Sequence, residues 1–296
     1  SAWWRWIAPK TGVYEIKTRS TTFDTVLAIY TGNSIGNLLL MAYNDDGYSY
    51  NFDSLINFSA TKGVAYRIAL DGYGGRSGRA TLDIRPTSSI PLANIDFERE
   101  QGFKPEATTS GIGLWQGDTE SAVIASNASG QFARIGGASN AGIAEPAQIW
   151  HPAIPDSATS STSVTSTFMA GLELPVDTTS ADVFSWTLYN SEETPLLALG
   201  FSAADGSITV TNAEGETWHL EQRLVSGAGH RFEITTDFEN NVWSLLFDGV
   251  DVLLDQPLGI TSEAPNLKDV SAGWTPAGGT QASMFFYYFF ISKHTP

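Results

Sequence analysis

The stretch from residue 231 to 249, RFEITTDFENNVWSLLFDG, gives the clearest signal of fold in this chain. Apolar side chains recur at every second position on both sides of Asn240-Asn241, which is the period of strands that bury one face. Asn240-Asn241 and Asp248-Gly249 are residue pairs typical of tight turns between such strands. The stretch therefore predicts a meander of antiparallel strands.

The rest of the sequence follows the same pattern. There are 28 Gly and 13 Pro residues between short runs rich in Val, Ile, Thr and aromatic residues, and no long stripe has the helical period of 3.6. We expect an all-β chain with helix in less than about a tenth of it. Further strands are expected at 13–18, 25–30, 64–70 and 80–84, and the Ser/Thr-rich run 157–167 is expected to form a solvent-facing strand.

The length of 296 residues suits two domains. The segment from Arg85 to Pro91, RPTSSIP, has no periodicity and is rich in Pro and Ser, as boundaries between domains often are. We therefore expect two β-sandwich domains, at 1–88 and 91–296.

Charge differs between the two parts. The whole chain has 16 Lys and Arg against 32 Asp and Glu, a formal net charge of −16. Residues 1–90 hold nine basic and seven acidic side chains, whereas residues 91–296 hold seven and 25. This balance argues against nucleic acid as a partner. The sequence offers no apolar run of membrane-spanning length and no cysteine for disulfides, zinc–thiolate sites or thiol catalysis.

Five ordered motifs in the first part resemble the bacterial pre-peptidase C-terminal-like domain. The resemblance covers about residues 1–85 and implies a small β-sandwich without catalytic activity, attached to secreted and surface proteins. It also implies a strand before the tryptophan motif, so the edge of the first strand is expected to lack a partner. The motifs are Trp3-Trp4-Arg5-Trp6, Gly12-Val13-Tyr14, Phe23 to Gly32, Asn44-Asp45-Asp46 and Tyr66 to Gly72.

Residues 94–292 are similar to concanavalin A-like, laminin-G-like jelly rolls. The similarity lies in Asp96-Phe97-Glu98, the Trp115 motif, the hairpin at Trp243 to Gly249 and the aromatic closing strand 285–292. Such folds serve as lectins, carbohydrate-binding modules, adhesion domains and glycosidases, so the fold alone does not select a function.

The sequence predicts that the protein is not an enzyme. Glycosidases of this fold place Glu-x-Asp-x-x-Glu on one strand, and no such string occurs here. Asp96/Glu98 and Asp237/Glu239 are pairs at i and i+2 that lack the third carboxylate. Zinc, phosphate-loop, dinucleotide and serine-nucleophile motifs are also missing.

Calcium is a possible cofactor, because Asp24, Asn44, Asp45 and Asp46 offer the oxygen ligands that it prefers. The alternative is that Asn-Asp-Asp-Gly forms a hairpin held by Asx-type hydrogen bonds, without an ion.

Nine tryptophans could serve either the core or a sugar-binding surface. Trp3, Trp6, Trp186 and Trp243 lie in alternating apolar strands and are expected to be buried. Trp115, Trp150, Trp218 and Trp274 have Gly, Pro or polar neighbours and are the candidate sugar-stacking residues.

Two functions remain in competition. The first is a non-enzymatic structural or adhesive protein of the bacterial surface or matrix, which self-associates head to tail into filaments by strand complementation at the first strand. The second is a carbohydrate-binding region of a secreted polysaccharide-degrading enzyme, with a polysaccharide as partner. Both place the protein outside the cell.

Overall fold

The computed structural model describes residues 1–19, 22–45, 53–95, 97, 116–117, 122–127, 130–137, 146–152, 163–174, 180–261, 266–277 and 282–294. Within them the chain forms strands and two short 3₁₀ helices, so the all-β prediction is confirmed. No helix in this part of the chain is long and apolar enough to cross a membrane.

The chain divides into two compact units. The first comprises Ser1–Pro91 and Lys293–Pro296, and the second comprises Leu92–Ser292. Each unit has its own cluster of buried apolar side chains. The assignment of domain families to 1–88 and 91–296 stays a prediction.

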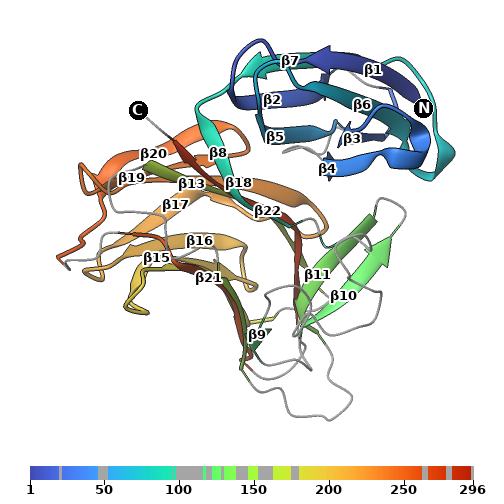
Figure 1. Ribbon diagram of the computed structural model, residues 1–296. Helices are drawn as coiled ribbons and strands as arrows, with labels where there is room; N and C mark the ends of the chain where they lie inside the picture. Colours follow the sequence, from blue (N-terminus) through green and yellow to red (C-terminus); the bar gives the residue numbers. More distant parts are fainter. Residues whose placement is uncertain are drawn as a thin grey trace. The chain divides into compact units, whose positions relative to one another are not determined.

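The N-terminal unit contains two antiparallel sheets (Figure 1). One has the strand order β1-β6-β3-β4 and the other β5-β2-β7. Apolar residues at alternate positions, such as Ile16 in β2 and Ile29 in β3, form the core. The elements are β1 (Ala2–Ile7), β2 (Gly12–Arg19), β3 (Thr25–Thr31), η1 (Ile35–Asn37), β4 (Leu39–Asn44), β5 (Leu55–Ala60), β6 (Ala65–Gly72), η2 (Tyr73–Gly75) and β7 (Thr81–Pro86).

The first strand, β1, separates its tryptophans. Trp6 packs against the core, with its ring 4.8 Å from that of Tyr14. Trp3 faces the other way and is 49% exposed, so the prediction that it is buried is wrong. Period-two alternation explains the difference, because an odd and an even position of one strand lie on opposite faces.

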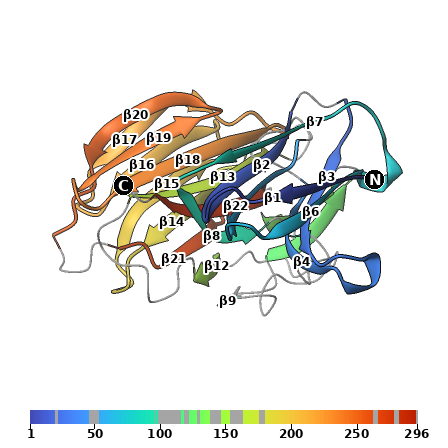
Figure 2. The same ribbon diagram turned by 45° about the horizontal axis from the view of Figure 1, so that its top comes forward.

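The C-terminal unit is a sandwich of two large antiparallel sheets (Figures 1 and 2). The first has the order β10-β11-β22-β13-β18-β19-β20, with β8 also beside β22, and the second has the order β17-β16-β15-β14-β21-β12-β9. The strands of the first sheet are β8 (Ser89–Ile95), β10 (Ala122–Asn127), β11 (Gly130–Gly136), β13 (Ser163–Glu173), β18 (Gly229–Asp237), β19 (Val242–Phe247), β20 (Val250–Pro257) and β22 (Ser283–His294). Those of the second are β9 (Gln116–Gly117), β12 (Ala147–Pro152), β14 (Val183–Tyr189), β15 (Pro195–Ser202), β16 (Ser207–Asn212), β17 (Thr217–Arg223) and β21 (Asp269–Thr275).

Aromatic side chains fill the space between these sheets. Trp186 and Trp243 are fully buried, as predicted. Phe168 of β13 stacks on Trp186 of the opposite sheet at 4.5 Å and on Phe232 of β18 at 4.9 Å. Large rings from both sheets thus replace the disulfides that this cysteine-free chain cannot form.

The predicted meander is present as β18, β19 and β20. Asn241, Asp248 and Gly249 adopt positive φ angles of 55°, 52° and 79° at its two turns. The carboxylate of Asp248 accepts a hydrogen bond from the backbone N–H of Arg231 at 2.8 Å and lies 2.8 Å from His230 Nδ1. The turn therefore also fixes the first strand of the meander.

Two sequence expectations need correction. Of the strand predicted at 157–167, residues 157–162 lie outside the described residues. Residues 163–167 are in a strand, but this part of β13 is mostly buried rather than solvent-facing. Its place between β22 and β18, inside the sheet, explains the burial. The segment 85–91, expected to lack regular structure, is also largely strand, because β7 continues to Pro86 and β8 begins at Ser89. The division between the two compact units nevertheless falls at its end, after Pro91.

Candidate functional site

The outer face of the seven-stranded sheet carries a row of small and polar residues. Strand register aligns this row across six strands, from β12 to β17. The row consists of Gln148, Gly273, Ser185, Gly200, Thr209 and His219. Its neighbours along each strand, such as Trp186 and Leu199, point into the core. Because Gly273, Ser185 and Gly200 in the middle of the row are small, few side-chain atoms project from the sheet there.

A hollow of about 310 Å³ lies at the β12 end of this face. It is lined by Gln148, Tyr189, Glu193, Asp269 and Ser271. Gln148 Nε2 donates hydrogen bonds to Tyr189 Oη at 3.2 Å and to Ser271 Oγ at 3.0 Å. Three strands that are distant in sequence thus contribute to one hydrogen-bonded group.

The β14–β15 hairpin positions one wall of the hollow. Asn190 Oδ1 accepts hydrogen bonds from the backbone N–H groups of Glu192 at 3.0 Å and Thr194 at 2.8 Å. Glu193 has a φ of 59°, so this tight turn holds it in the left-handed region. The backbone N–H of Lys268 donates to the Tyr189 carbonyl at 2.7 Å, which ties the hairpin to the residue before β21.

The side chains of the hollow match the chemistry of sugar hydroxyls. An amide, a phenol, a hydroxyl and two carboxylates provide donors and acceptors around a small open space. Glu193 is exposed and Asp269 is only half-buried. The arrangement can donate hydrogen bonds to a polar ligand and accept them from it.

Two of the candidate sugar-stacking tryptophans, Trp274 and Trp218, are buried or half-buried. Trp274 is 2% exposed and its Nε1 donates to Asp182 Oδ2 at 3.2 Å, so the prediction that it is exposed is wrong. Trp218 is half-buried, with its ring 5.2 Å from that of Trp243 and its Nε1 bonded to Gln256 Oε1 at 3.1 Å. Neither offers a free ring face comparable to an exposed platform.

The other two candidates are described only in part or not at all. Trp150 lies on β12, where its backbone pairs with Ser271 and Gln116, at the hollow's end of the sheet. Its side chain, and the whole of Trp115, lie outside what the structure describes.

The calcium candidates lie at one end of the N-terminal unit. Asn44 Oδ1 accepts a hydrogen bond from the backbone N–H of Leu55 at 2.9 Å, and the carbonyl of Asp45 accepts one from Ser54 Oγ at 3.1 Å. Asn44 Oδ1 thus links the end of β4 to the start of β5, and the choice between a calcium site and a simple hairpin stays a prediction. Asp46 lies outside the described residues, among which no group of three metal-ligating side chains occurs.

Asp24 differs from these residues because its side chain is only 2% exposed. It borders a cavity of about 380 Å³ together with Thr22, Phe23, Arg76 and Ser77. Burial raises the pKa of the Asp24 carboxyl, and the guanidinium of Arg76, 4.0 Å away, opposes this shift.

Of the two carboxylate pairs noted in the sequence, Asp237/Glu239 lies among the described residues. Asp237 Oδ1 accepts hydrogen bonds from the backbone N–H groups of Glu239 and Asn240, both at 3.0 Å, so it stabilises the turn. The hydrogen bond from the Asn240 side chain lowers the pKa of Asp237 further. Asp96 and Glu98 lie outside the described residues.

No protein-family model matches the chain, and no curated protein does. Among solved structures it is similar to an endo-1,3-beta-glucanase from Streptomyces sioyaensis, with a TM-score of 0.52 and 10% identity over 72% of this chain and 99% of that one. It also matches the winged bean acidic lectin complexed with methyl-alpha-D-galactose, with a TM-score of 0.48 and 12% identity over 70% and 100% of the two chains. A sialidase matches at 0.48 and 10% identity over 79% of this chain but only 20% of its own length.

These likenesses concern the fold. Together with the two facing sheets, the glucanase match confirms the prediction of a jelly-roll, concanavalin A-like sandwich. These likenesses do not show the resemblance of residues 1–85 to the pre-peptidase C-terminal-like domain, which stays a prediction.

Sequence reasoning missed the residues of the hollow. Period-two alternation in 183–189 could have shown that Ser185, Thr187 and Tyr189 face away from the core. It could not have shown that Gln148 and Ser271 lie beside Tyr189, because strand order in a sheet is not written in any local pattern.

Proposed function

We propose that the C-terminal unit binds carbohydrate on the outer face of its seven-stranded sheet, as a binding region of a secreted protein that acts on or recognises polysaccharides. The observation that carries the proposal is the hydrogen-bonded group of Gln148, Tyr189 and Ser271 in an open hollow on that face. The jelly-roll fold is compatible with this function and does not by itself select it.

The row of small residues extends the proposed site beyond the hollow. Six neighbouring strands at about 4.8 Å spacing give the row a length of about 24 Å. A linear sugar chain lying across the strands would contact Gly273, Ser185 and Gly200 without steric obstruction from long side chains. The hollow would then hold one end of a longer ligand.

The proposal includes the absence of catalysis. Two-carboxylate hydrolysis needs an acid and a second carboxylate on opposite sides of a bound bond. Exposed Glu193, on a turn rather than a strand, is poorly suited to the role of the acid. We therefore expect binding without turnover.

A glycan array followed by calorimetry on the best ligand tests the proposal. Tyr189→Ala and Gln148→Ala should each weaken binding about tenfold, since each removes hydrogen bonds to the ligand or their orientation. Val250→Ala, at an exposed position of β20 in the opposite sheet, is the matched control and should leave the affinity unchanged. Absence of any glycan ligand, or equal loss in the control, would overturn the proposal. If the wild-type protein releases new reducing ends from a polysaccharide and Glu193→Gln does not, the protein is instead an enzyme.

Self-assembly is the second candidate, and β1 carries it. Among the described strands β1 pairs only with β6, which leaves one of its edges open. Trp4 of this strand is 40% exposed and Ile7 46% exposed, and such an edge can accept a strand from another molecule. Filaments in electron micrographs of purified protein would favour this function, whereas a monomer at high concentration would exclude it.

A further inference from the structure

The outer face of the sheet β1-β6-β3-β4 combines three aromatic residues with two arginines. Because Trp6, Ile68 and Ile29 point into the core, the alternating positions face outward. Register places the outward residues in two adjoining rows. One row is Trp3, Ala69, Ala28 and Tyr43, and the other is Arg5, Arg67, Tyr30 and Leu40.

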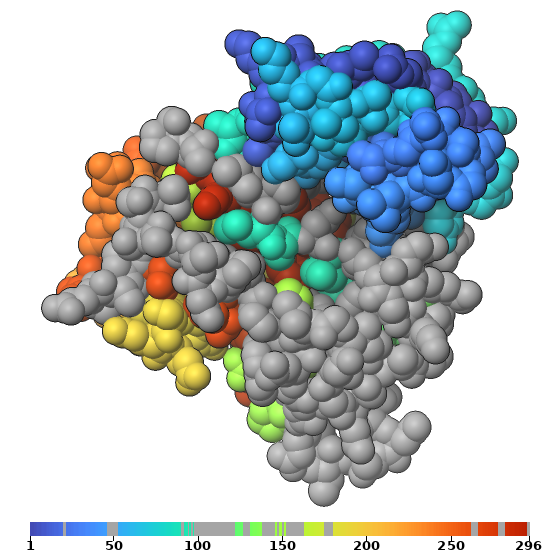
Figure 3. Space-filling model, viewed as in Figure 1, coloured from blue at the N-terminus to red at the C-terminus, as the bar shows by residue number. Residues whose placement is uncertain are grey.

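Two of the aromatic rings, those of Trp3 and Tyr30, lie close together and are called the platform here. The ring centres of Trp3 and Tyr30 are 5.7 Å apart, and their planes differ by only 30°. Ala69 and Ala28, directly paired with each other, are the short side chains between these two strands. Leu40, opposite Tyr30, is 49% exposed, and its strand (mid-blue in Figure 3) lies at the surface of that view. An exposed apolar surface of this kind commonly marks a binding site.

The arginines beside the platform are unusual in their pairing. Arg5 and Arg67 are directly opposite each other on neighbouring strands, and like charges in that position destabilise a sheet. Neither forms an ion pair with any described residue, and Arg67 Nη1 is buried without a hydrogen-bond partner.

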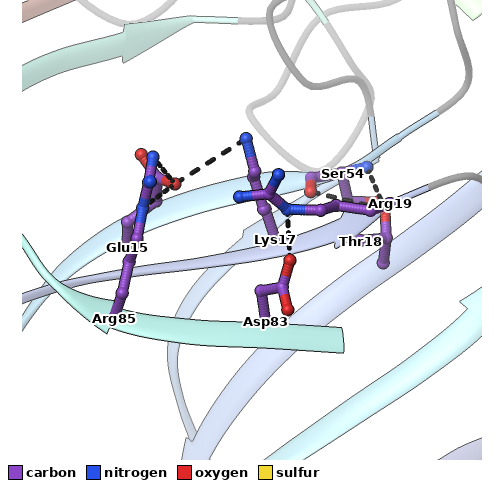
Figure 4. A network of polar contacts seen from close by, with 7 residues as sticks. All are labelled: Glu15, Lys17, Thr18, Arg19, Ser54, Asp83 and Arg85. Carbon is purple, nitrogen blue, oxygen red and sulfur yellow. Dashed lines mark hydrogen bonds and ion pairs between the residues drawn. The ribbon is translucent and has the colours of Figure 1, made fainter. Parts of the chain in front are cut away.

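In the sheet β5-β2-β7 of the same unit, by contrast, arginines form ion pairs with carboxylates (Figure 4). Arg85 Nη2 lies 2.7 Å from Glu15 Oε1, directly across from it on the paired strand. Arg19 likewise forms an ion pair with Asp83. The unit therefore neutralises arginines on one face and leaves a pair of them unneutralised on the other.

Among the described residues of this outer face, Asp71 is the one carboxylate, and it does not pair with Arg5 or Arg67. Asp71 lies four residues along β6 from Arg67, or about 13 Å at the usual rise of a strand. Its Oδ1 accepts the backbone N–H of Gly72 at 2.9 Å. The positive charge at Arg5 and Arg67 is thus available to a ligand.

We propose that this face is a second binding surface, specific for a polysaccharide whose sugars carry carboxylates. Sugar rings would stack on Trp3 and Tyr30. A carboxylate would accept hydrogen bonds from the exposed guanidinium of Arg5 and from the part of the Arg67 guanidinium other than its buried Nη1. The whole chain has a net charge of −16, so non-specific attraction of polyanions is weak and binding depends on these local contacts.

The probe is an oligogalacturonate titrated into the full chain at low salt, beside a neutral galactose oligomer of equal length and dextran sulfate. We expect the uronate alone to bind well. Trp3→Ala and the double variant Arg5→Gln/Arg67→Gln should each weaken binding at least tenfold. Arg67→Lys, which keeps the charge but loses the planar fork, should also weaken it.

Arg85→Gln is the matched control, because it removes the same charge from the other sheet of the same unit. Equal weakening by Arg85→Gln, or equal binding of dextran sulfate, would show general charge attraction and overturn the proposal. So would a failure of the uronate to bind, or self-association that Arg5→Gln/Arg67→Gln abolishes, which would identify a second copy as the occupant. Tyr189→Ala should leave uronate binding intact, so this surface can fail or succeed independently of the C-terminal hollow.

Discussion

Asp237 shows how one side chain makes a turn dependent on pH. Hydrogen bonds from the Asn240 side chain and from the backbone lower the pKa of Asp237 below its ordinary value of 3.8. A carboxyl whose pKa is lower in the folded state stabilises the fold above 3.8, and this contribution is lost as the pH falls through the folded-state pKa.

We therefore expect Asp237→Ala to destabilise the protein at pH 7 by at most about 1 kcal/mol, since the site is near solvent. The difference from wild type should shrink below pH 3.8. Urea unfolding of both proteins at pH 7 and at a pH below 3.8 measures this difference in the free energy of unfolding. A difference that stays constant with pH would contradict the assigned role of the ionised carboxylate.

Asn44 separates the two interpretations of the Asn-Asp-Asp-Gly motif. Because its Oδ1 already accepts the N–H of Leu55, we expect Asn44→Ala to lower the melting temperature equally in calcium and in chelator. Wild type should melt at the same temperature in both. A calcium-dependent rise in wild type that Asn44→Ala or Asp24→Asn removes would instead establish an ion site.

The fate of individual tryptophans marks the limit of sequence reasoning at this scale. Trp274 has Gly and Pro neighbours, yet it is buried because Asp182, 92 residues earlier in the chain, accepts its N–H. Asp182 also accepts the backbone N–H groups of Ala277 and Ala282. Local composition cannot reveal a buried carboxylate that is satisfied by such distant donors.

At the scale of elements, the Asp248-Gly249 turn can be tested alone. Gly249 has a φ of 79°, and a Cβ built there would meet no atom within 4 Å. Gly249→Ala should therefore cost about 1 kcal/mol through backbone conformation alone. Gly36→Ala, also in open space but without a positive φ, is the control and should be nearly neutral. Equal stability of both variants in urea unfolding would contradict this account of the turn.

Strands were predictable where one face is buried and the turns are short. The meander β18-β19-β20 meets both conditions. The Ser/Thr-rich part of β13 meets neither, because its place inside the sheet buries polar residues such as Ser166 and Thr167. Composition suggested solvent exposure there, whereas strand order, which is non-local, decided burial.

At the scale of the whole molecule, the proposed binding faces of the two units differ in chemistry. The C-terminal hollow offers neutral and acidic hydrogen-bonding groups, and the N-terminal face offers aromatic rings and guanidinium groups. The charge division between residues 1–90 and 91–296 was visible in the sequence. The faces themselves were not, because each is assembled from strands that pair across long separations.

The position of a bound oligosaccharide in a crystal structure of the complex tests the central proposal most directly. The ligand would be the best neutral binder from the glycan array. We predict a sugar ring in the hollow, within hydrogen-bond distance of Gln148, Tyr189 and Ser271, with the chain continuing across Gly273 and Ser185. A sugar bound only elsewhere on the C-terminal unit would contradict the account.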